Sequence, residues 1–227
     1  MRKISTVWIM LTMVAFFLIQ INVEGDETAT DEKHLIIVSG YLGYSHDSVN
    51  KASSYKEYLK TNCSKSDIYY LTDPLDIESD GPSNLSNIEK AFQWLSSNSN
   101  SNTKVSVYIF DHITMIDHNA TFLFDDCNIS TNTIDSWLEM VICESMTVIL
   151  NGERSSLGGE YLKDSNREVI CSMEYYQEFD PDNFNITRSL EDQTSDINGD
   201  GEISYLEAYQ NECELLENTG QNPVIWI

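Results

Sequence analysis

Oxygen-bearing side chains recur at alternate positions in the run DINGDGEISYLE, which begins at Asp196 and ends at Glu207. Gly201 stands where a sharp turn is needed, and we expect Ile203 to point toward the core. This spacing is typical of an EF-hand calcium loop, in which oxygen donors converge on one Ca²⁺ ion. The expected ligands are the side chains of Asp196, Asn198 and Asp200, the backbone carbonyl of Glu202, the hydroxyl or a bound water at Ser204, and the bidentate carboxylate of Glu207.

The sequence contains no second copy of this loop. A lone loop of this kind in an exported protein more often stabilises structure than senses calcium, and extracellular sites bind weakly. An Asp/Gly turn without an ion is the alternative interpretation. Regulation by calcium is a weaker hypothesis.

A second group of candidate residues follows two apolar stretches. Asp111 and His112 follow the run VSVYIF, and the polar segment 151–156 (NGERSS) follows the run MTVIL. A histidine at one strand end and a nucleophile at the end of the neighbouring strand form a Cys/His dyad. The strands that precede these two segments decide whether the segments can meet.

Short β-branched runs alternate with segments that carry apolar residues at helical spacing. This alternation predicts an α/β fold with a mostly parallel sheet and helices on both faces. Sites in such sheets form at the carboxyl ends of the strands, so the loops beginning at Gly40, Asp111 and Asn151 are the ones of interest. The expected strands are 34–40, 67–71, 105–110, 146–150 and 168–171, and the expected helices are 48–60, 85–95 and 133–141.

The first residues predict export from the cytoplasm. Arg2 and Lys3 precede an apolar run, 7–21, of the length of a signal-peptide core. An uncleaved N-terminal membrane anchor is the alternative. We expect the protein to be secreted or held at the exterior of the cell envelope, and its five Asn-x-Ser/Thr sequons are compatible with a glycoprotein.

The charge and the cysteines exclude some functions. A net charge of −24, from 13 basic and 37 acidic residues, disfavours nucleic acid and anionic membrane surfaces as partners. The five cysteines lack the spacing of a zinc site, and an oxidising compartment would allow up to two disulfides. These observations leave a soluble, acidic, exported domain as the expected class.

The chain from about residue 34 to 172 resembles the legumain-like cysteine peptidases of the caspase and gingipain clan. The run VSGYLGYSH, 38–46, is similar to the family's glycine-rich loop that runs into Tyr-Arg-His. Asp111-His112-Ile113 is similar to the family's Asp-His-Gly, in which the histidine is catalytic. The run NGERSS lies at the distance of the family's nucleophile turn, which is similar to Glu-Ala-Cys-x-Ser-Gly. The resemblance implies a caspase-like three-layer fold with His112 at the catalytic histidine position.

The departures from the family pattern fall where the chemistry should be. Glu153 replaces the nucleophilic cysteine, and a carboxylate cannot replace a thiolate in acyl transfer from a peptide. Ile113 replaces the glycine that leaves room for substrate, and Ser45 replaces the arginine of the pocket for an acidic side chain. We expect a signal peptide at 1–25, a flexible leader at 26–33, a caspase/legumain-like domain at 34–190, and the calcium loop and C-terminal tail at 191–227.

These features together predict an exported, calcium-binding peptidase homologue that is catalytically inactive. It would act as a binding or structural module, with a peptide or protein in the vestigial cleft. The alternative is an active cysteine endopeptidase that uses a displaced thiol. Cys143 is the only thiol in a suggestive context, although it precedes the MTVIL strand and would lie at the opposite end of the sheet.

Overall fold

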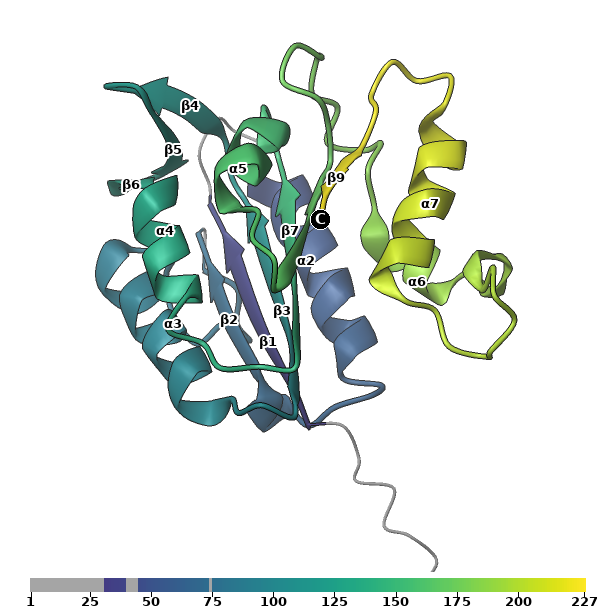
Figure 1. The fold of residues 1–227 in the computed structure, drawn as a ribbon. Helices are drawn as coiled ribbons and strands as arrows, with labels where there is room; N and C mark the ends of the chain where they lie inside the picture. The colour runs from purple at the N-terminus through teal and green to yellow at the C-terminus, as the bar shows by residue number, and fades with distance from the viewer. Residues whose placement is uncertain (1–30, 40–44, 74) are drawn as a thin grey trace, which may run out of the picture. The chain divides into compact units, whose positions relative to one another are not determined.

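A parallel sheet forms the centre of the computed structural model, which describes residues 31–39, 45–73 and 75–227 (Figure 1). The six strands lie in the order β2-β1-β3-β7-β8-β9, and only the β8–β9 pair is antiparallel. The expected signal peptide and most of the expected leader lie outside the described residues. The strands of this sheet are β1 (Asp31–Val38), β2 (Ile68–Thr72), β3 (Thr103–Phe110), β7 (Ser145–Asn151), β8 (Arg167–Cys171) and β9 (Val224–Trp226).

Alternation along the buried strands divides the core into two layers. In β1, Leu35 and Ile37 contribute to one hydrophobic cluster, whereas Ile36 and Val38 contribute to the other. This is the period of two expected of a strand that is buried on both faces. The predicted α/β class, with a mostly parallel sheet and helices on both faces, is therefore confirmed.

Three helices cover each face of the main sheet (Figure 1). Their apolar residues recur at helical spacing, as in Ile88, Ala91, Phe92 and Leu95, and each stripe is buried against the strands. The helices of the first face are α3 (Leu85–Asn98), α4 (Thr131–Leu138) and α5 (Ser155–Leu162), and those of the second are α2 (Ser45–Leu59), α6 (Ile186–Glu191) and α7 (Tyr205–Leu216). In the part of the chain that the structure describes, no helix is long and apolar enough to cross a membrane.

A small antiparallel sheet follows β3 and was not predicted. It consists of β4 (Ile113–Ile116), β5 (Asn119–Phe124) and β6 (Cys127–Ser130), in that order. Asp117 and His118 adopt positive φ in the tight turn between β4 and β5. Phe122 and Phe124 from this sheet are buried in the first core layer, so the hairpin adds to the domain core.

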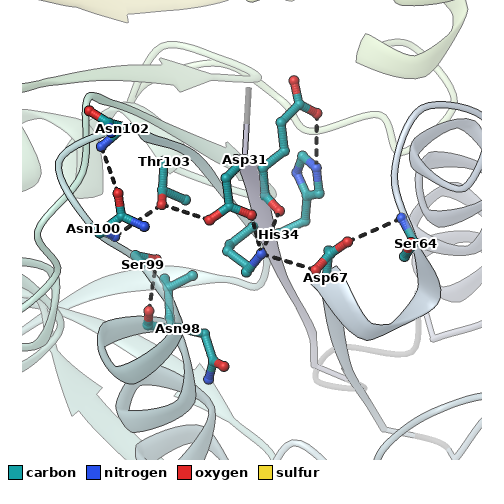
Figure 2. Close-up of polar contacts among 12 residues, drawn as sticks. Asp31, His34, Ser64, Asp67, Asn98, Ser99, Asn100, Asn102 and Thr103 are labelled. Carbon is teal, nitrogen blue, oxygen red and sulfur yellow. Dashed lines mark hydrogen bonds and ion pairs between the residues drawn. The ribbon is translucent and has the colours of Figure 1, made fainter. Parts of the chain in front are cut away.

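The first strand begins earlier than the sequence predicts. β1 starts at Asp31, so residues 31–33 of the expected flexible leader pair with β3. The Lys33 ammonium lies at ion-pair distance from Asp31 and Asp67, and Asp31 also accepts a hydrogen bond from Thr103 (Figure 2). These polar contacts hold the first residues of β1, which lie before the apolar run.

Helix α5 packs so closely on strands β8 and β9 that only a glycine fits at position 159. A Cβ atom at Gly159 would lie 2.4 Å from Cys171 Sγ and 2.6 Å from Trp226 Cδ1. Alanine in a helix is ordinarily favoured over glycine by about 1 kcal/mol, so intrinsic propensity and packing oppose each other here.

We predict that packing wins in Gly159→Ala, which should lower the free energy of unfolding by about 1–3 kcal/mol. Chemical denaturation measures the change. Glu160→Ala, at the next and exposed position, is the matched control and should change stability by less than about 0.5 kcal/mol. A Gly159→Ala protein more stable than the parent would contradict the close contact.

Candidate functional site

The structure brings His112 and Glu153 together at the carboxyl edge of the main sheet. β3 and β7 are adjacent and parallel, and each residue follows one of these strands. His112 Nδ1 lies 2.9 Å from Glu153 Oε2. The two segments that follow these strands therefore meet through an imidazole and a carboxylate.

Backbone hydrogen bonds extend the β3–β7 ladder beyond the strand ends and hold this pair. The Asp111 amide donates to the Asn151 carbonyl at 3.1 Å, and the Ile113 amide donates to the Glu153 carbonyl at 3.1 Å. Gly152 has a φ of +154°, and a Cβ there would lie 2.0 Å from the Asp111 carbonyl oxygen. Only glycine allows the two segments to approach this closely.

Burial sets the protonation behaviour of this edge. Burial lowers the pKa of His112, the Glu153 carboxylate opposes that change, and the Arg154 guanidinium adds to it. Asp111 is buried next to the histidine, and desolvation raises the pKa of its carboxyl well above the usual range. The site therefore favours a neutral imidazole and a neutral Asp111.

Arg154 is a site residue that sequence reasoning did not single out. It adopts a left-handed conformation, with φ +61°, directly before helix α5. Its guanidinium donates to Thr114 Oγ1 at 3.2 Å and lies over the ring of Tyr175. Its place beside Glu153 in the sequence was the only signal available, because the turn that presents it depends on the β7–α5 connection.

Ile113 has a structural role that the family comparison did not suggest. Its side chain is 1% exposed and belongs to the first core layer. Its Cδ1 atom would lie 2.5 Å from a Cβ at Gly158, so the isoleucine fills the space that the glycine of α5 leaves. The other departure, at Ser45, falls at the first residue of α2, whose side chain is outside the described part of the structure.

No described contact joins a cysteine to His112, and Glu153 is the residue that lies beside its ring. All five are free thiols, so the disulfides considered from the sequence are not formed. Cys143 precedes β7, and the seven-residue strand places it roughly 20 Å from the carboxyl edge, as the sequence predicted. Burial raises the pKa of every one of these thiols, which disfavours the reactive thiolate: Cys63, Cys127, Cys143, Cys171 and Cys213.

The expected calcium loop is a series of tight turns that end at helix α7. Gly199 and Gly201 have φ values of +74° and +91°, as the sharp turns require. Asp196 accepts hydrogen bonds from the amides of both glycines, at 2.8 and 3.0 Å. Two further side chains accept from the amide two residues on, namely Asn198 from Asp200 and Asp200 from Glu202.

Glu207 closes this loop from the first turn of α7. Its Oε1 accepts from the amides of Ile197 and Asn198, both at 3.1 Å, and its Oε2 accepts from the amide and hydroxyl of Ser204. These bonds from Ser204 and the loop amides lower the pKa of Glu207 and keep it ionised. Ile203 packs against the second core layer, as expected.

The types of donor atom in this loop suit a calcium ion. Its donors are carboxylate, amide, carbonyl and hydroxyl oxygens, the hard ligands that Ca²⁺ prefers. Within the described ranges, no three His, Cys, Asp or Glu side chains are gathered closely enough to hold a metal. Ion binding would therefore require Asp196 and Glu207 to exchange some of their amide contacts for the metal.

The calcium loop and the His112–Glu153 pair lie at opposite edges of the main sheet. Glu202 and Ile203 line a cavity together with Lys104, Ser145 and other residues from the amino ends of the strands. His112 and Glu153 follow the carboxyl ends of β3 and β7. A single ligand could not contact both groups unless it spanned the sheet.

Comparison of the chain with protein-family models and with curated proteins gave no match.

Glu153 and Arg154 have opposing effects on the pKa of His112, so substitutions of the two residues should shift this pKa in opposite directions. Glu153→Gln removes the charge that raises the pKa of His112, so this pKa should fall further below its usual value. Arg154→Asn removes the charge that lowers it, so the pKa should rise, and asparagine tolerates the left-handed backbone. Titration of the histidine ring protons by NMR measures both shifts.

The loss of folding stability at low pH should also change in opposite directions in the two variants. A histidine whose pKa is lowered in the folded state loses stability as pH falls below the unfolded value of about 6.5. Glu153→Gln should steepen that loss, and Arg154→Asn should reduce it. Shifts of the same sign in both variants would contradict the observed arrangement.

Proposed function

We propose that this protein is an exported, legumain-like domain of the caspase type that has lost peptidase activity and binds one calcium ion. In this proposal it acts as a binding or structural module, and the edge around His112 is the remnant of a peptidase cleft. The observation that carries the proposal is the contact of 2.9 Å between His112 Nδ1 and Glu153 Oε2. A carboxylate fills the place of the nucleophile beside the histidine.

Three features of the fold support the family assignment. The histidine segment and the NGERSS segment follow adjacent parallel strands, as the resemblance requires. Helices cover both faces of the sheet, in the three layers expected of a caspase-like domain. The turn at Gly152 brings the position of the family nucleophile next to the histidine, although that position is now Glu153.

The chemistry of the site supports the loss of peptidase activity. Acyl transfer from a peptide needs a nucleophile that can form and release an ester or thioester, and the carboxyl group of a glutamate does not provide one. Burial also lowers the pKa of His112, so its role beside Glu153 is that of a hydrogen-bonding partner. The alternative, a peptidase that uses Cys143, is disfavoured because the thiol lies at the far edge of the sheet.

Calcium would act here as a structural ion. The loop connects the short helix η3 (Gln193–Ser195) to α7, and Glu207 belongs to both the loop and the capping box that begins α7. An ion held by Asp196 and Glu207 would therefore join the start of α7 to the preceding turn. The helix also carries Glu212, which is fully buried and pairs with Arg188 of α6, so the ion would order the α6–α7 pair.

We predict that calcium raises the thermal stability of the protein. With a Kd of about 10⁻⁴ to 10⁻³ M, about 10 mM calcium should add about 1–3 kcal/mol and raise Tm by about 3–10 °C. Asp196→Asn should remove most of this increase. Melting curves with calcium and with a chelator measure the effect.

Glu214→Gln is the matched control, because it removes one acidic charge at an exposed position of α7 outside the loop. Its melting temperature should respond to calcium as the parent does. An equal response in all three proteins would indicate general screening of the acidic surface. No response in the parent would overturn the calcium part of the proposal.

A further inference from the structure

A cavity of about 700 Å³ opens at the amino edge of the main sheet, away from His112. Its walls come from the starts of β1, β3 and β7, the end of α2, the end of α6 and the calcium loop. It shares Glu32, Lys104, Glu202 and Tyr205 with a second cavity of about 680 Å³. Volumes of this size are those of ligand sites, and the shared walls favour an extended ligand over a compact one.

A chain of hydrogen bonds crosses one wall of this cavity. His34 Nδ1 lies 2.7 Å from Ser106 Oγ, which lies 2.9 Å from the Tyr55 hydroxyl, and that hydroxyl lies 2.6 Å from the Tyr205 hydroxyl. Ser106 is enclosed between His34 and Tyr55 and is 1% exposed, so it is not accessible as a nucleophile. The chain instead fixes the positions of His34 and Tyr205.

The second nitrogen of His34 is buried and faces a carboxylate. Its Nε2 atom has Glu32 Oε2 as its charged neighbour, at 3.4 Å, and both residues line the cavity (Figure 2 shows His34 at this edge). This contact holds the Glu32 carboxylate in the wall of the cavity. A polar group of a ligand in the cavity would lie next to this pair.

The charged side chains around this cavity favour a positively charged ligand group. Three carboxylates, those of Glu32, Glu191 and Glu202, line it against the single ammonium of Lys104. His34 and Lys104 lower the pKa of Glu32, so this carboxylate is ionised. Tyr58 lines the same cavity as Glu32 and Glu191, and its pKa is raised by burial and also by these two carboxylates. Carboxylates next to aromatic rings form a site for an organic cation.

We propose that this edge of the sheet binds an alkylammonium ligand, with its charged end between Glu32 and Glu191 and beside the rings of Tyr58 and Tyr205. A primary ammonium has three donors, which suits two carboxylates and a hydroxyl. Its methylene chain extends along the shared wall toward the second cavity, whose lining adds the carboxylates of Glu144, Asp164 and Glu168. A linear polyamine or a lysine-rich peptide supplies this chemistry. The site shares a wall with the expected calcium loop, because Glu202 lines both cavities, but Glu32 and Glu191, which hold the charged end, are not among the expected calcium ligands.

Isothermal titration of the full chain with spermidine at physiological ionic strength tests this site. The parent should bind, and the double variant Glu32→Gln/Glu191→Gln should weaken binding by about tenfold or more. Glu89→Gln removes an exposed carboxylate from α3, on the other face of the sheet, and should leave the affinity unchanged. A melting curve of each variant shows that it is folded.

A trilysine peptide titrated in parallel distinguishes the two sources of the ammonium group. Tighter binding of the peptide, lost in the same double variant, assigns the site to a basic peptide, and tighter binding of spermidine assigns it to a polyamine. Failure of both probes to bind at millimolar concentration, or equal weakening by Glu89→Gln, would overturn the proposal.

Discussion

The parallel pairing of β3 with β7 is the interaction on which the rest of the structure depends. The two strands lie at the middle of the main sheet, and their register joins residues 104–110 to residues 145–151. Each contributes residues to both core layers, so both sets of helices pack against this pair. The same register continues past Asn151 and brings Glu153 to His112, while the opposite ends of the two strands line the cavities near the calcium loop.

This arrangement separates two kinds of chemistry. The carboxyl edge keeps the geometry of a dyad but pairs the imidazole with a carboxylate, and Gly152 holds the close approach that a nucleophile turn would need. The amino edge carries the acidic walls and the oxygen-rich loop. The buried core of the sheet separates the two edges, so a change of side chains at one edge leaves the other edge unaltered.

Much of the fold could be predicted from the sequence because its strands are apolar runs bounded by turns. The runs before Asp111 and Asn151 are strands at the expected positions, and the residues after them meet as expected. The β4–β6 hairpin was missed because its strands are short and its turn uses Asp117 and His118 in place of the usual glycine. β9 was missed because three residues near the chain end carry no periodic signal, and their pairing with β8 is a long-range contact.

The candidate sites also differ in how far they could be predicted from the sequence. The expected calcium loop is a local motif, so its candidate ligands could be named from the spacing of Asp196 to Glu207 alone. The residues of the amino-edge cavity could not be predicted from spacing, because His34 contacts Ser106 across 72 residues of sequence and Tyr55 contacts Tyr205 across 150. Side chains that form a site through long-range pairing carry no spacing signal, whatever their chemistry.

The most direct test of the central claim, that Glu153 has replaced the nucleophile, is cleavage of a broad library of fluorogenic peptides by the purified protein under reducing conditions with calcium present. The account predicts no cleavage above the background of a His112→Ala variant, before or after thiol alkylation. Cleavage that requires His112 and is abolished by alkylation would contradict it, and would show that a thiol reaches this edge of the sheet.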